Sequence, residues 1–483
     1  MEFLRIAASD RVAVVHPDGS AVTYRELLRS ADQAGRLLPH RRKALVALFG
    51  DREPGTLVTY VAALRQGHAV GWFGSVPDPA QRVALVRRFR PDVIVAPPHQ
   101  LADSVPGSTY RPVGSAFLGV AVARQVGGPR PDVHPDTSVL LMTSGSMSSG
   151  RAVRLSGAAI AANSRAIAEA LDIRPNSRAA TALPLFYSYG LSVINSHFAM
   201  GASVLLTDAP ASGTRFWREF AAAGCTIFPA VPLHLQWLTR TRRAWNLVPT
   251  LRAVTVSGAR TSATLAKSIH EQAERIGFQF FKMYGQTEAT ARISVLQHED
   301  LPARPDSVGR VVPGSTVVIE GDDGGQVPDG TEGHIIYRGP NAMQGYADSA
   351  ADLSRPDEMA GTVDTRDLGF MADGFLHVTG RTGRFVKPGG RRLELDVVEE
   401  LFSEVASSAV VGTDDERAHV FVEGGPLPAI EEVRSGILRQ GRVGPDDLRI
   451  HFVASLPRRL NGKVDYRALY ETAMAQGPDK AEF

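Results

Sequence analysis

Between residues 178 and 284, short apolar segments alternate with segments of helical periodicity, and this alternation restricts the fold more than any other feature. The strand candidates are 179–183, 202–207, 226–228, 252–256 and 278–284, with helices such as 262–276 between them. Such alternation is typical of a parallel sheet covered by helices. Right-handed crossovers bring every loop that follows a strand to one edge, and ligands bind outside that edge. We therefore expect a pocket formed by the loops 184–190, 229–232, 257–260 and 285–290.

The same alternation occurs before residue 100, whereas the later chain follows a different pattern. From about 303 to 377, frequent Gly, Asp and Pro turns separate short strand candidates, which favours a small antiparallel or barrel-like unit. Beyond 380, a basic, glycine-marked stretch precedes short strands and helices. We predict an α/β fold with a large N-terminal domain (1–380) of two helix-flanked sheets plus a small β-barrel-like subdomain. A small α+β C-terminal domain (381–483) follows.

The composition argues against several functional classes. Lys and Arg number 53 and Asp and Glu 51 among 483 residues, so neither a nucleic-acid partner nor a membrane partner is indicated. Cys225 is the single cysteine, which excludes an intrachain disulfide and fits a reducing compartment. Its apolar surroundings favour a buried structural thiol over a nucleophile. Neither a signal-peptide pattern nor an apolar stretch of membrane-spanning length is present, so we expect a cytoplasmic protein.

The segment 143–151, TSGSMSSGR, combines hydroxyl groups, glycines and one cation, Arg151. Small residues let backbone N–H groups and hydroxyls converge on an anion, so we interpret the segment as a phosphate-binding loop. It differs from the loop of P-loop NTPases, which ends in Gly-Lys-Ser/Thr at a helix start. Val153 and Leu155 alternate as in a strand, and Ser156 is a candidate helix cap. The loop should therefore join two strands; a Ser/Gly-rich surface loop without function is the alternative.

Five motifs in register resemble those of the AMP-forming adenylating enzymes. They are the loop at 143–151, YGQTE at 284–288, RDLG at 366–369, GR at 380–381 and NGK at 461–463. This superfamily includes acyl- and aryl-CoA synthetases, adenylation domains of nonribosomal peptide synthetases and firefly luciferase, and the resemblance covers about residues 10–470. It implies activation of a carboxylic acid by ATP and Mg²⁺ to acyl-AMP, with release of pyrophosphate. The acyl group would then pass to a thiol of CoA or of carrier-protein pantetheine.

The resemblance assigns three residues to this chemistry. Lys463 matches the C-terminal lysine that bridges the substrate carboxylate and the α-phosphate, and it stands out in a chain that otherwise uses mostly arginine. Glu288 matches the glutamate that holds Mg²⁺, and Thr287 would hydrogen-bond a phosphate. Cations and dipoles are needed because a carboxylate attacks a negatively charged phosphate. Solvated turn residues are the alternative for Lys463 and Glu288.

The resemblance also implies a nucleotide site. Asp367 matches the aspartate that accepts hydrogen bonds from both ribose hydroxyls, Arg381 would support the same ribose, and Tyr284 would lie against the adenine. A turn residue is the alternative for Asp367. The ATP- or AMP-binding candidates are Thr143, Ser144, Gly145, Ser146, Arg151, Gly258, Ala259, Tyr284, Gly285, Gln286, Asp367 and Arg381.

By the same resemblance, the C-terminal domain would be mobile. It would rotate about a hinge at Gly383 after adenylation, withdraw Lys463 and present a second loop to a pantetheine tunnel. Lys387, Gly389 and Gly390 are the candidates for this thioester-forming face, with a basic solvated turn as the alternative.

Five positions depart from the family pattern. In the loop, the family usually has lysine where Arg151 stands, and glycine and proline where Ser148 and Gly150 stand. It usually has glycine where Arg366 stands, and Asp or Lys where Gly383 stands. These changes concern rate more than reaction class, but they leave open a catalytically weak nucleotide-binding paralogue. Another alternative is the same adenylation followed by transfer to an amine or other nitrogen nucleophile.

The substrate-pocket candidates follow from their position at the sheet edge. They are Tyr187, Ser188, Tyr189, Gly190, Val231 and Ser257. The segment 184–197 offers no acid to pair with an ammonium group, and an unpaired ammonium in an apolar pocket is costly, so we expect a small-molecule acid with an uncharged acyl or aryl tail. Arg292 could meet a second acidic group, but a structural ion pair is the preferred interpretation. An acyl carrier protein is a further candidate partner.

Overall fold

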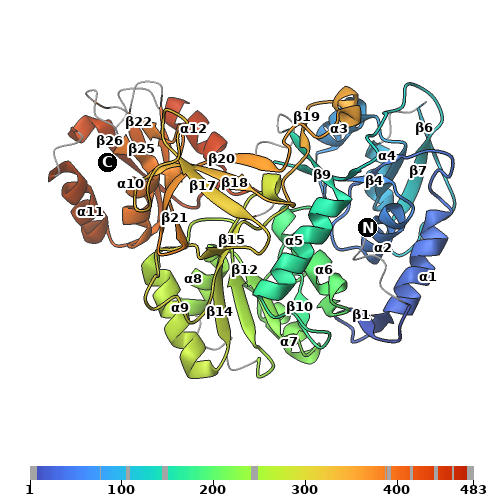
Figure 1. The fold of residues 1–483 in the computed structure, drawn as a ribbon, viewed down its shortest axis with the longest axis horizontal. Coiled ribbons are helices and arrows are strands. Elements are labelled where there is room, and N and C mark those ends of the chain that lie inside the picture. Colours follow the sequence, from blue (N-terminus) through green and yellow to red (C-terminus); the bar gives the residue numbers. More distant parts are fainter. Residues whose placement is uncertain are drawn as a thin grey trace.

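The computed structural model describes residues 8–76, 78–104, 109–143, 151–240, 248–386, 388, 393–413, 417–439, 444–459 and 462–475. It confirms a mixed α/β fold with several sheets (Figure 1). The elements that follow β21 (Phe375–Arg381) lie together at one end of the molecule, across from the N-terminal strands.

The N-terminal sheet has the strand order β19-β9-β8-β4-β3-β5-β7-β6. Its strands are β3 (Leu45–Leu48), β4 (Ala69–Trp72), β5 (Val93–Ala96), β6 (Tyr110–Pro112), β7 (Ala121–Gln125), β8 (Thr137–Met142), β9 (Ala152–Ser156) and β19 (Gly345–Ala347). Strands β8, β4, β3 and β5 are parallel, whereas β9 and β7 pair antiparallel with β8 and β5. Every residue of β3, β4 and β5 is buried, as expected for parallel strands covered on both faces.

The second sheet has the order β16-β15-β14-β13-β12-β10-β11-β1-β2. Its strands are β1 (Val12–Val15), β2 (Ala21–Thr23), β10 (Arg178–Ala180), β11 (Ser203–Leu205), β12 (Ile227–Ala230), β13 (Ala253–Val256), β14 (Gln279–Tyr284), β15 (Ser294–Leu296) and β16 (Arg310–Val311). The run from β14 through β13, β12, β10 and β11 to β1 is parallel. This run confirms the parallel sheet predicted for residues 178–284.

The helices that accompany these sheets are α1 (Tyr24–Gly35), α2 (Pro54–Arg65), α3 (Pro79–Phe89), α4 (Pro98–Ser104), α5 (Gly157–Ala170), α6 (Ser188–Ala199), α7 (Thr214–Ala222), α8 (Pro232–Arg240) and α9 (Ala263–Ile276). Helices α5 and α6 lie between the two sheets (Figure 1), where Ile160 and Ile194 share one hydrophobic cluster with Val139 of β8 and Val204 of β11. As predicted, the Ser156 side chain caps α5 by accepting the Ala159 N–H at 3.0 Å.

The later chain forms smaller units. An antiparallel sheet of order β17-β18-β20-β21 contains β17 (Thr316–Glu320), β18 (Gly333–Arg338), β20 (Thr362–Ala372) and β21, which confirms the antiparallel alternative for this region. After it come β22 (Phe385–Val386), β23 (Leu393–Glu394), α10 (Leu395–Ser403), β24 (Ser407–Gly412), β25 (Ala418–Glu423), α11 (Leu427–Arg439), β26 (Leu448–Val453) and α12 (Tyr466–Ala475). Val386, Phe402, Val420 and Ile430 belong to a hydrophobic cluster within this terminal segment. The exact domain boundary at 380 stays a prediction.

Several predicted boundaries at the second sheet are wrong. Strand β10 ends at Ala180 rather than at 183, and Ser188 to Gly190 form the first turn of α6 rather than a loop. Only glycine fits at position 190 of this helix, because a Cβ there would lie 2.1 Å from the Pro184 carbonyl oxygen. Pro229 and Ala230, predicted in a loop, extend β12. Proline is tolerated because β10 pairs with β12 at Ile227, so position 229 lies beyond that ladder.

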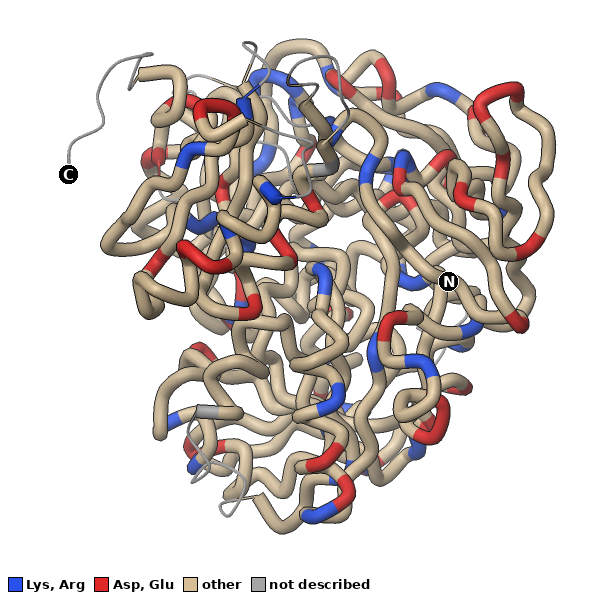
Figure 2. Tube along the Cα trace, turned by 90° about the vertical axis from the view of Figure 1, so that its left-hand side faces the viewer, with Lys and Arg blue, Asp and Glu red and all other residues tan. Residues whose placement is uncertain are grey.

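The remaining global expectations concern the thiol, the charge and the membrane. Cys225 is buried, and burial raises the pKa of its thiol to about 12, which accords with a structural role. Lys and Arg are interspersed with Asp and Glu along the trace (Figure 2). Within the described ranges, every helix is too short or too polar to span a bilayer.

The burial of Lys282 in β14 can be tested through the pH dependence of folding stability. Its side chain is 5% exposed and donates to the Pro305 carbonyl at 2.9 Å, and burial lowers its pKa from 10.5 to about 8. Between these two values the unfolded chain binds more protons at this site than the folded chain does, so stability rises with pH. We expect wild type to gain about 2 kcal/mol relative to Lys282→Met between about pH 7.5 and 9.5.

Denaturant unfolding of both proteins at the two pH values measures this difference. Lys267→Met, at an exposed position of α9, is the matched control and should follow wild type. Identical pH slopes for wild type and Lys282→Met would show that this lysine keeps its ordinary pKa in the fold.

Candidate functional site

The loops that follow parallel strands meet at one edge of the second sheet, as predicted. The Thr287 hydroxyl, beyond β14, donates to Ser188 Oγ, at the start of α6, at 3.1 Å. The Tyr187 hydroxyl lies 2.9 Å from the place that a Cβ on Gly258 would occupy, and a Val231 methyl lies 3.6 Å from the same point. Gly258 has a φ of +94°, so both the backbone conformation and the space require glycine here.

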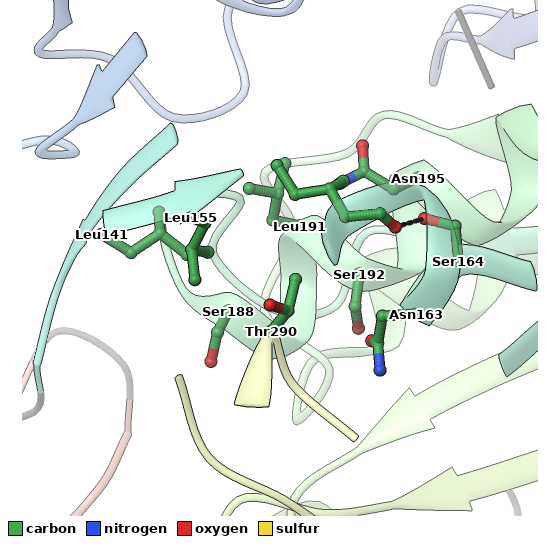
Figure 3. Close-up of a pocket in the computed structure, with 10 residues that line it drawn as sticks. Leu141, Leu155, Asn163, Ser164, Ser188, Leu191, Ser192, Asn195 and Thr290 are labelled. Atoms are coloured by element: carbon green, nitrogen blue, oxygen red, sulfur yellow. Dashed lines mark hydrogen bonds between the residues drawn. The ribbon is translucent and has the colours of Figure 1, made fainter. Parts of the chain in front are cut away.

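The other pocket candidates surround the first turn of α6. Tyr189 is 2% exposed, and its hydroxyl contacts the Thr255 carbonyl and hydroxyl at 3.0 and 2.8 Å. Burial raises the pKa of Tyr189 to about 12, so the phenol stays protonated. Ser257 is also buried, at the end of β13. A small cavity lies beside Ser188 and is lined by Thr290 and by residues of α5, α6 and the β8–β9 pair (Figure 3).

Three predicted nucleotide-binding residues form one cluster where β14 approaches β20 and β21. The Tyr284 hydroxyl donates to Asp367 Oδ2, and Arg381 Nε donates to Asp367 Oδ1 at 2.8 Å. Burial, and then the neighbouring Asp367 carboxylate, raise the pKa of Tyr284 well above its ordinary value. The Asp367 side chain is 10% exposed, so its oxygens are held in fixed directions. Such an acceptor suits the two hydroxyls of a ribose.

Arg366, one of the departures from the family pattern, adopts a left-handed backbone with a φ of +58°. Glycine occupies this conformation without steric cost, whereas other residues pay about 1 kcal/mol or more. The conformation is stabilised by the Asp364 carboxylate, which accepts the Arg366 N–H at 2.9 Å. The backbone before Asp367 therefore has a conformation that favours glycine, although arginine stands there.

Glu288 lies in the short 3₁₀ turn Thr287–Ala289 and contacts the N-terminal sheet. Its Oε1 accepts the Tyr346 hydroxyl at 2.9 Å, and the Arg151 guanidinium lies 4.2 Å from the centre of the Tyr346 ring. Arg151 Nε also pairs with Asp348 at 3.2 Å. Among the described residues Glu288 has no ion-pair partner, so the carboxylate keeps an oxygen for a cation. Its oxygen donor set fits Mg²⁺, which binds proteins through few carboxylates and takes its other ligands from phosphate and water.

Gly285 and Gln286 link Tyr284, which belongs to the cluster with Asp367 and Arg381, to Thr287 and Glu288. Gly285 is required sterically, because a Cβ there would lie 1.9 Å from the Ala291 carbonyl oxygen. Gln286 Nε2 is buried and, within the described part of the chain, has no hydrogen-bond partner. A buried amide without an acceptor is costly, so a ligand oxygen is the expected partner. Ala259, next to Gly258, is exposed at the same edge.

Lys463 of the C-terminal segment lies at this edge. Its Nζ lies 5.2 Å from the centre of the Tyr187 ring. Lys463 follows Gly462, which has a φ of +78°. The Lys463 carbonyl accepts the Arg459 N–H at 2.8 Å. Gly383, the hinge candidate, also has a positive φ, +85°, in the turn between β21 and β22.

An ion pair links the terminal segment to the sheet edge. Arg260 follows β13 and pairs with Glu400 of α10 at 2.7 Å, while its second terminal nitrogen donates to the Thr379 carbonyl at 3.0 Å. The two side chains are 45% and 28% exposed. The pair therefore connects the segment that carries Lys463 to the loop that carries Gly258.

Several predicted residues lie outside the described ranges. They are Ser144, Gly145 and Ser146 of the phosphate loop and the thioester-face candidates Lys387, Gly389 and Gly390. The flanks of the phosphate loop are described: Thr143 donates its N–H to the Arg151 carbonyl at 3.0 Å, next to the β8–β9 pairing of Met142 with Ala152. The two predicted strands that flank this segment are confirmed, and they pair antiparallel.

One expectation about the pocket is wrong, and one contact was missed. Arg292 was expected to form a structural ion pair, but no carboxylate among the described residues lies within ion-pair distance of it. Tyr346 was not anticipated, because it stands 58 residues from Glu288 and on another sheet. No local periodicity signals such a contact; the only sequence cue is a tyrosine next to Gly345 in a turn-rich stretch.

The chain is similar in sequence to known enzymes over most of its length. The chain matches the model of the AMP-binding enzyme family over residues 5–347, more than half of its length. It is 28% identical over 505 aligned residues to an indoleacetate–CoA ligase of Aromatoleum aromaticum, covering 94% of this chain and 95% of that relative. A sulfoacetate–CoA ligase of Cupriavidus necator is also 28% identical, with 94% and 93% of the two chains covered.

A solved structure shows the same fold. The O-succinylbenzoate coenzyme A synthetase from Bacillus subtilis, in complex with AMP, matches with a TM-score of 0.76 over 96% of each chain at 19% identity. At this identity the likeness concerns the fold alone. The family match over residues 5–347, together with the motifs in register, shows that the chain belongs to the AMP-binding enzyme family, within the superfamily of AMP-forming adenylating enzymes.

Proposed function

We propose that this enzyme activates a small-molecule carboxylic acid with ATP to acyl-AMP and pyrophosphate, and then transfers the acyl group to a thiol, that of CoA or of carrier-protein pantetheine. One observation carries the proposal: Lys463 lies beside Tyr187 at the edge where Thr287 contacts Ser188. The family membership and the CoA ligases among the relatives support the reaction class.

In the first step a carboxylate oxygen of the acid bonds to the α-phosphorus of ATP while the bond to pyrophosphate breaks. The two reactants carry like charge, so the site must supply cations and oriented donors. Lys463 would share its ammonium between the carboxylate and the α-phosphate, and Thr287 would donate its hydroxyl to a phosphate oxygen. Asp367 and Arg381 would hold the ribose, and Tyr284 would fix Asp367 and lie against the adenine.

Mg²⁺ would bind Glu288 at the oxygen that Tyr346 leaves available. When bound, it would offset negative charge on the ATP phosphates. Arg151, stacked on Tyr346, would add a second positive charge on the side of the phosphate loop. Arginine keeps the charge that the family's lysine supplies but presents it through a planar group.

In the second step the thiol loses its proton to water and its sulfur bonds to the acyl carbonyl carbon. The bond from that carbon to the phosphate oxygen breaks, and AMP leaves. We infer that residues 1–380 form the AMP-binding domain and that residues 381–483 form a lid that rotates about Gly383. Rotation would withdraw Lys463 once its work in the first step is complete. A cytoplasmic location and a carrier-protein partner stay predictions.

If the lid rotates, the ion pair between Arg260 and Glu400 must break. Glu400→Gln is therefore expected to slow adenylation and speed thioester formation, each by about two- to fivefold, because a partly exposed pair contributes about 0.5–1 kcal/mol. Single-turnover rates of the two steps measure this split. Glu404→Gln, at an exposed position just past α10, is the matched control. Equal slowing of both steps by Glu400→Gln would contradict the idea that this ion pair holds the C-terminal segment in place during adenylation.

Product analysis tests the proposed function directly. The enzyme is incubated with ATP, Mg²⁺, a panel of acids and, in separate reactions, CoA, a pantetheinylated carrier protein or an amine. The proposal expects AMP release together with a thioester identified by its mass. An amide as the sole product would favour the nitrogen-acceptor alternative, and ATP binding without any product would favour a weakly catalytic nucleotide-binding protein.

A further inference from the structure

Arg292 is a buried cation next to the proposed acyl pocket. It precedes β15, and the residue is 2% exposed. Its guanidinium lies 4.1 Å from the centre of the Tyr189 ring. The Tyr189 and Tyr187 phenols also act electrostatically on this guanidinium, and the Lys463 Nζ lies 5.2 Å from the centre of the Tyr187 ring.

The hydrogen bonds of Arg292 leave its charge poorly compensated. The guanidinium has five N–H donors, and one of its terminal nitrogens donates to the Ala291 carbonyl at 2.8 Å. The other described contacts are long: Nε to Met283 Sδ at 3.3 Å and the second terminal nitrogen to Ser192 Oγ at 3.5 Å. No acidic side chain in the described ranges pairs with it. Burial accordingly lowers the pKa of Arg292.

A buried charge without a counter-ion is costly, and stacking on one phenol offsets only part of that cost. A purely structural role would be served as well by an apolar side chain of similar volume. Stacking on the Tyr189 ring fixes the plane of the Arg292 guanidinium, so its N–H groups point in defined directions. Those donors suit a planar or tetrahedral oxyanion.

A small cavity borders Arg292. It is also lined by Tyr189, Ser192, Thr255, Met283 and, on its apolar side, by residues such as Ile227. Its volume of about 10 Å³ has room for one water molecule, so a substrate tail must displace side chains to enter. Ser192 also lines the neighbouring cavity beside Ser188, where Figure 3 shows both side chains on α6.

We propose that the acid activated by this enzyme carries a second anionic group, a carboxylate or sulfonate at the far end of its tail, and that Arg292 binds this group. The inference rests on the proposed function and deepens it. It replaces the expectation of an uncharged tail, which came from the lack of an acid in segment 184–197. That lack disfavours a cationic tail, and the unpaired guanidinium disfavours a neutral one.

Matched pairs of acids test the proposal. Each pair shares one carbon skeleton and differs in the far end: hexanoate and hexanedioate, phenylacetate and 4-carboxyphenylacetate, propanoate and 3-sulfopropanoate. Acid-dependent ATP–pyrophosphate exchange gives kcat/KM for every acid. In the best pair, wild type should favour the doubly acidic member by about 100-fold or more, because a site built for a polar group rejects the analogue that lacks it.

Variants of Arg292 test whether this residue causes the preference for doubly acidic substrates. Arg292→Met should lower kcat/KM for the doubly acidic member about 100-fold and leave the monoacid within a few fold, and Arg292→Lys should keep part of the preference through its charge. Arg310→Met is the matched control, because Arg310 also stacks on a ring, that of Phe375 at 4.0 Å, away from the site. It should leave both acids unchanged.

The outcomes separate the two proposals. Exchange with monoacids that equals or exceeds exchange with their doubly acidic partners would overturn the role of Arg292 while the proposed function stands. Equal losses for both members in Arg292→Met would likewise show a structural residue. If that variant does not fold, the wild-type panel and Arg292→Lys decide. Exchange with no acid at all would contradict the proposed function itself.

Discussion

Lys463→Ala is expected to lower the rate of adenylate formation by about 100- to 1000-fold, while thioester formation from supplied acyl-AMP stays within a few fold of wild type. The reason is that the ammonium, positioned beside Tyr187, offsets charge that builds up only when the carboxylate attacks the α-phosphate, and one such donor is worth about 3–4 kcal/mol. In the second step this charge no longer develops. Pyrophosphate exchange measures the first step, and chromatography of the thioester measures the second.

Lys267→Ala is the matched control for this variant, because Lys267 is an exposed lysine of α9. It should leave both steps unchanged. Equal loss of both steps in Lys463→Ala would contradict the division of labour between the two parts of the chain, and full retention of both would make Lys463 a solvated turn residue.

Asp367→Asn is expected to lower kcat/KM for ATP by about 100-fold. The amide keeps the shape of the carboxylate but offers a single acceptor oxygen, so its NH₂ group either faces the Arg381 Nε–H, which is also a donor, or forces the Tyr284 hydroxyl to change from donor to acceptor. The ribose hydroxyls would also lose charge-assisted hydrogen bonds, each worth about 1.5–3 kcal/mol. Exchange measured against ATP concentration should show the loss mainly as a higher KM for ATP.

Asp329→Asn, an exposed turn residue outside the cluster, provides the control and should behave as wild type. A lower melting temperature of Asp367→Asn with an unchanged KM for ATP would show that the cluster of Asp367, Arg381 and Tyr284 is structural rather than a nucleotide site.

The edge of the second sheet was predictable because its determinants are local. Apolar strands followed by helical periodicity fix a parallel sheet, and the hand of the crossover then fixes where the loops meet. Thr287 and Ser188 meet there although they stand 99 residues apart. The motifs supplied the identity of Asp367 and Arg381, and the structure supplied their contact.

The remaining features depend on packing between distant segments, which periodicity does not encode. The start of α6 was misassigned because Ser188 and Gly190 have the composition of a turn, whereas the packing of the helix on the preceding loop decides the outcome. The contact of Tyr346 with Glu288 and the pairing of Arg260 with Glu400 join separate sheets and segments. Arg292 gives the opposite case: the sequence shows a charge, and only the fold shows that no acidic side chain among the described residues pairs with it.

Acid-dependent ATP–pyrophosphate exchange, measured over a panel of fatty, aryl, hydroxy, amino and doubly acidic acids, tests the central claim most directly. The account predicts exchange stimulated by one class of acid, strongest for acids with a second anionic group, and lost in Lys463→Ala. Measurable ATP binding without exchange for any acid in the panel would contradict adenylation as the function of this site.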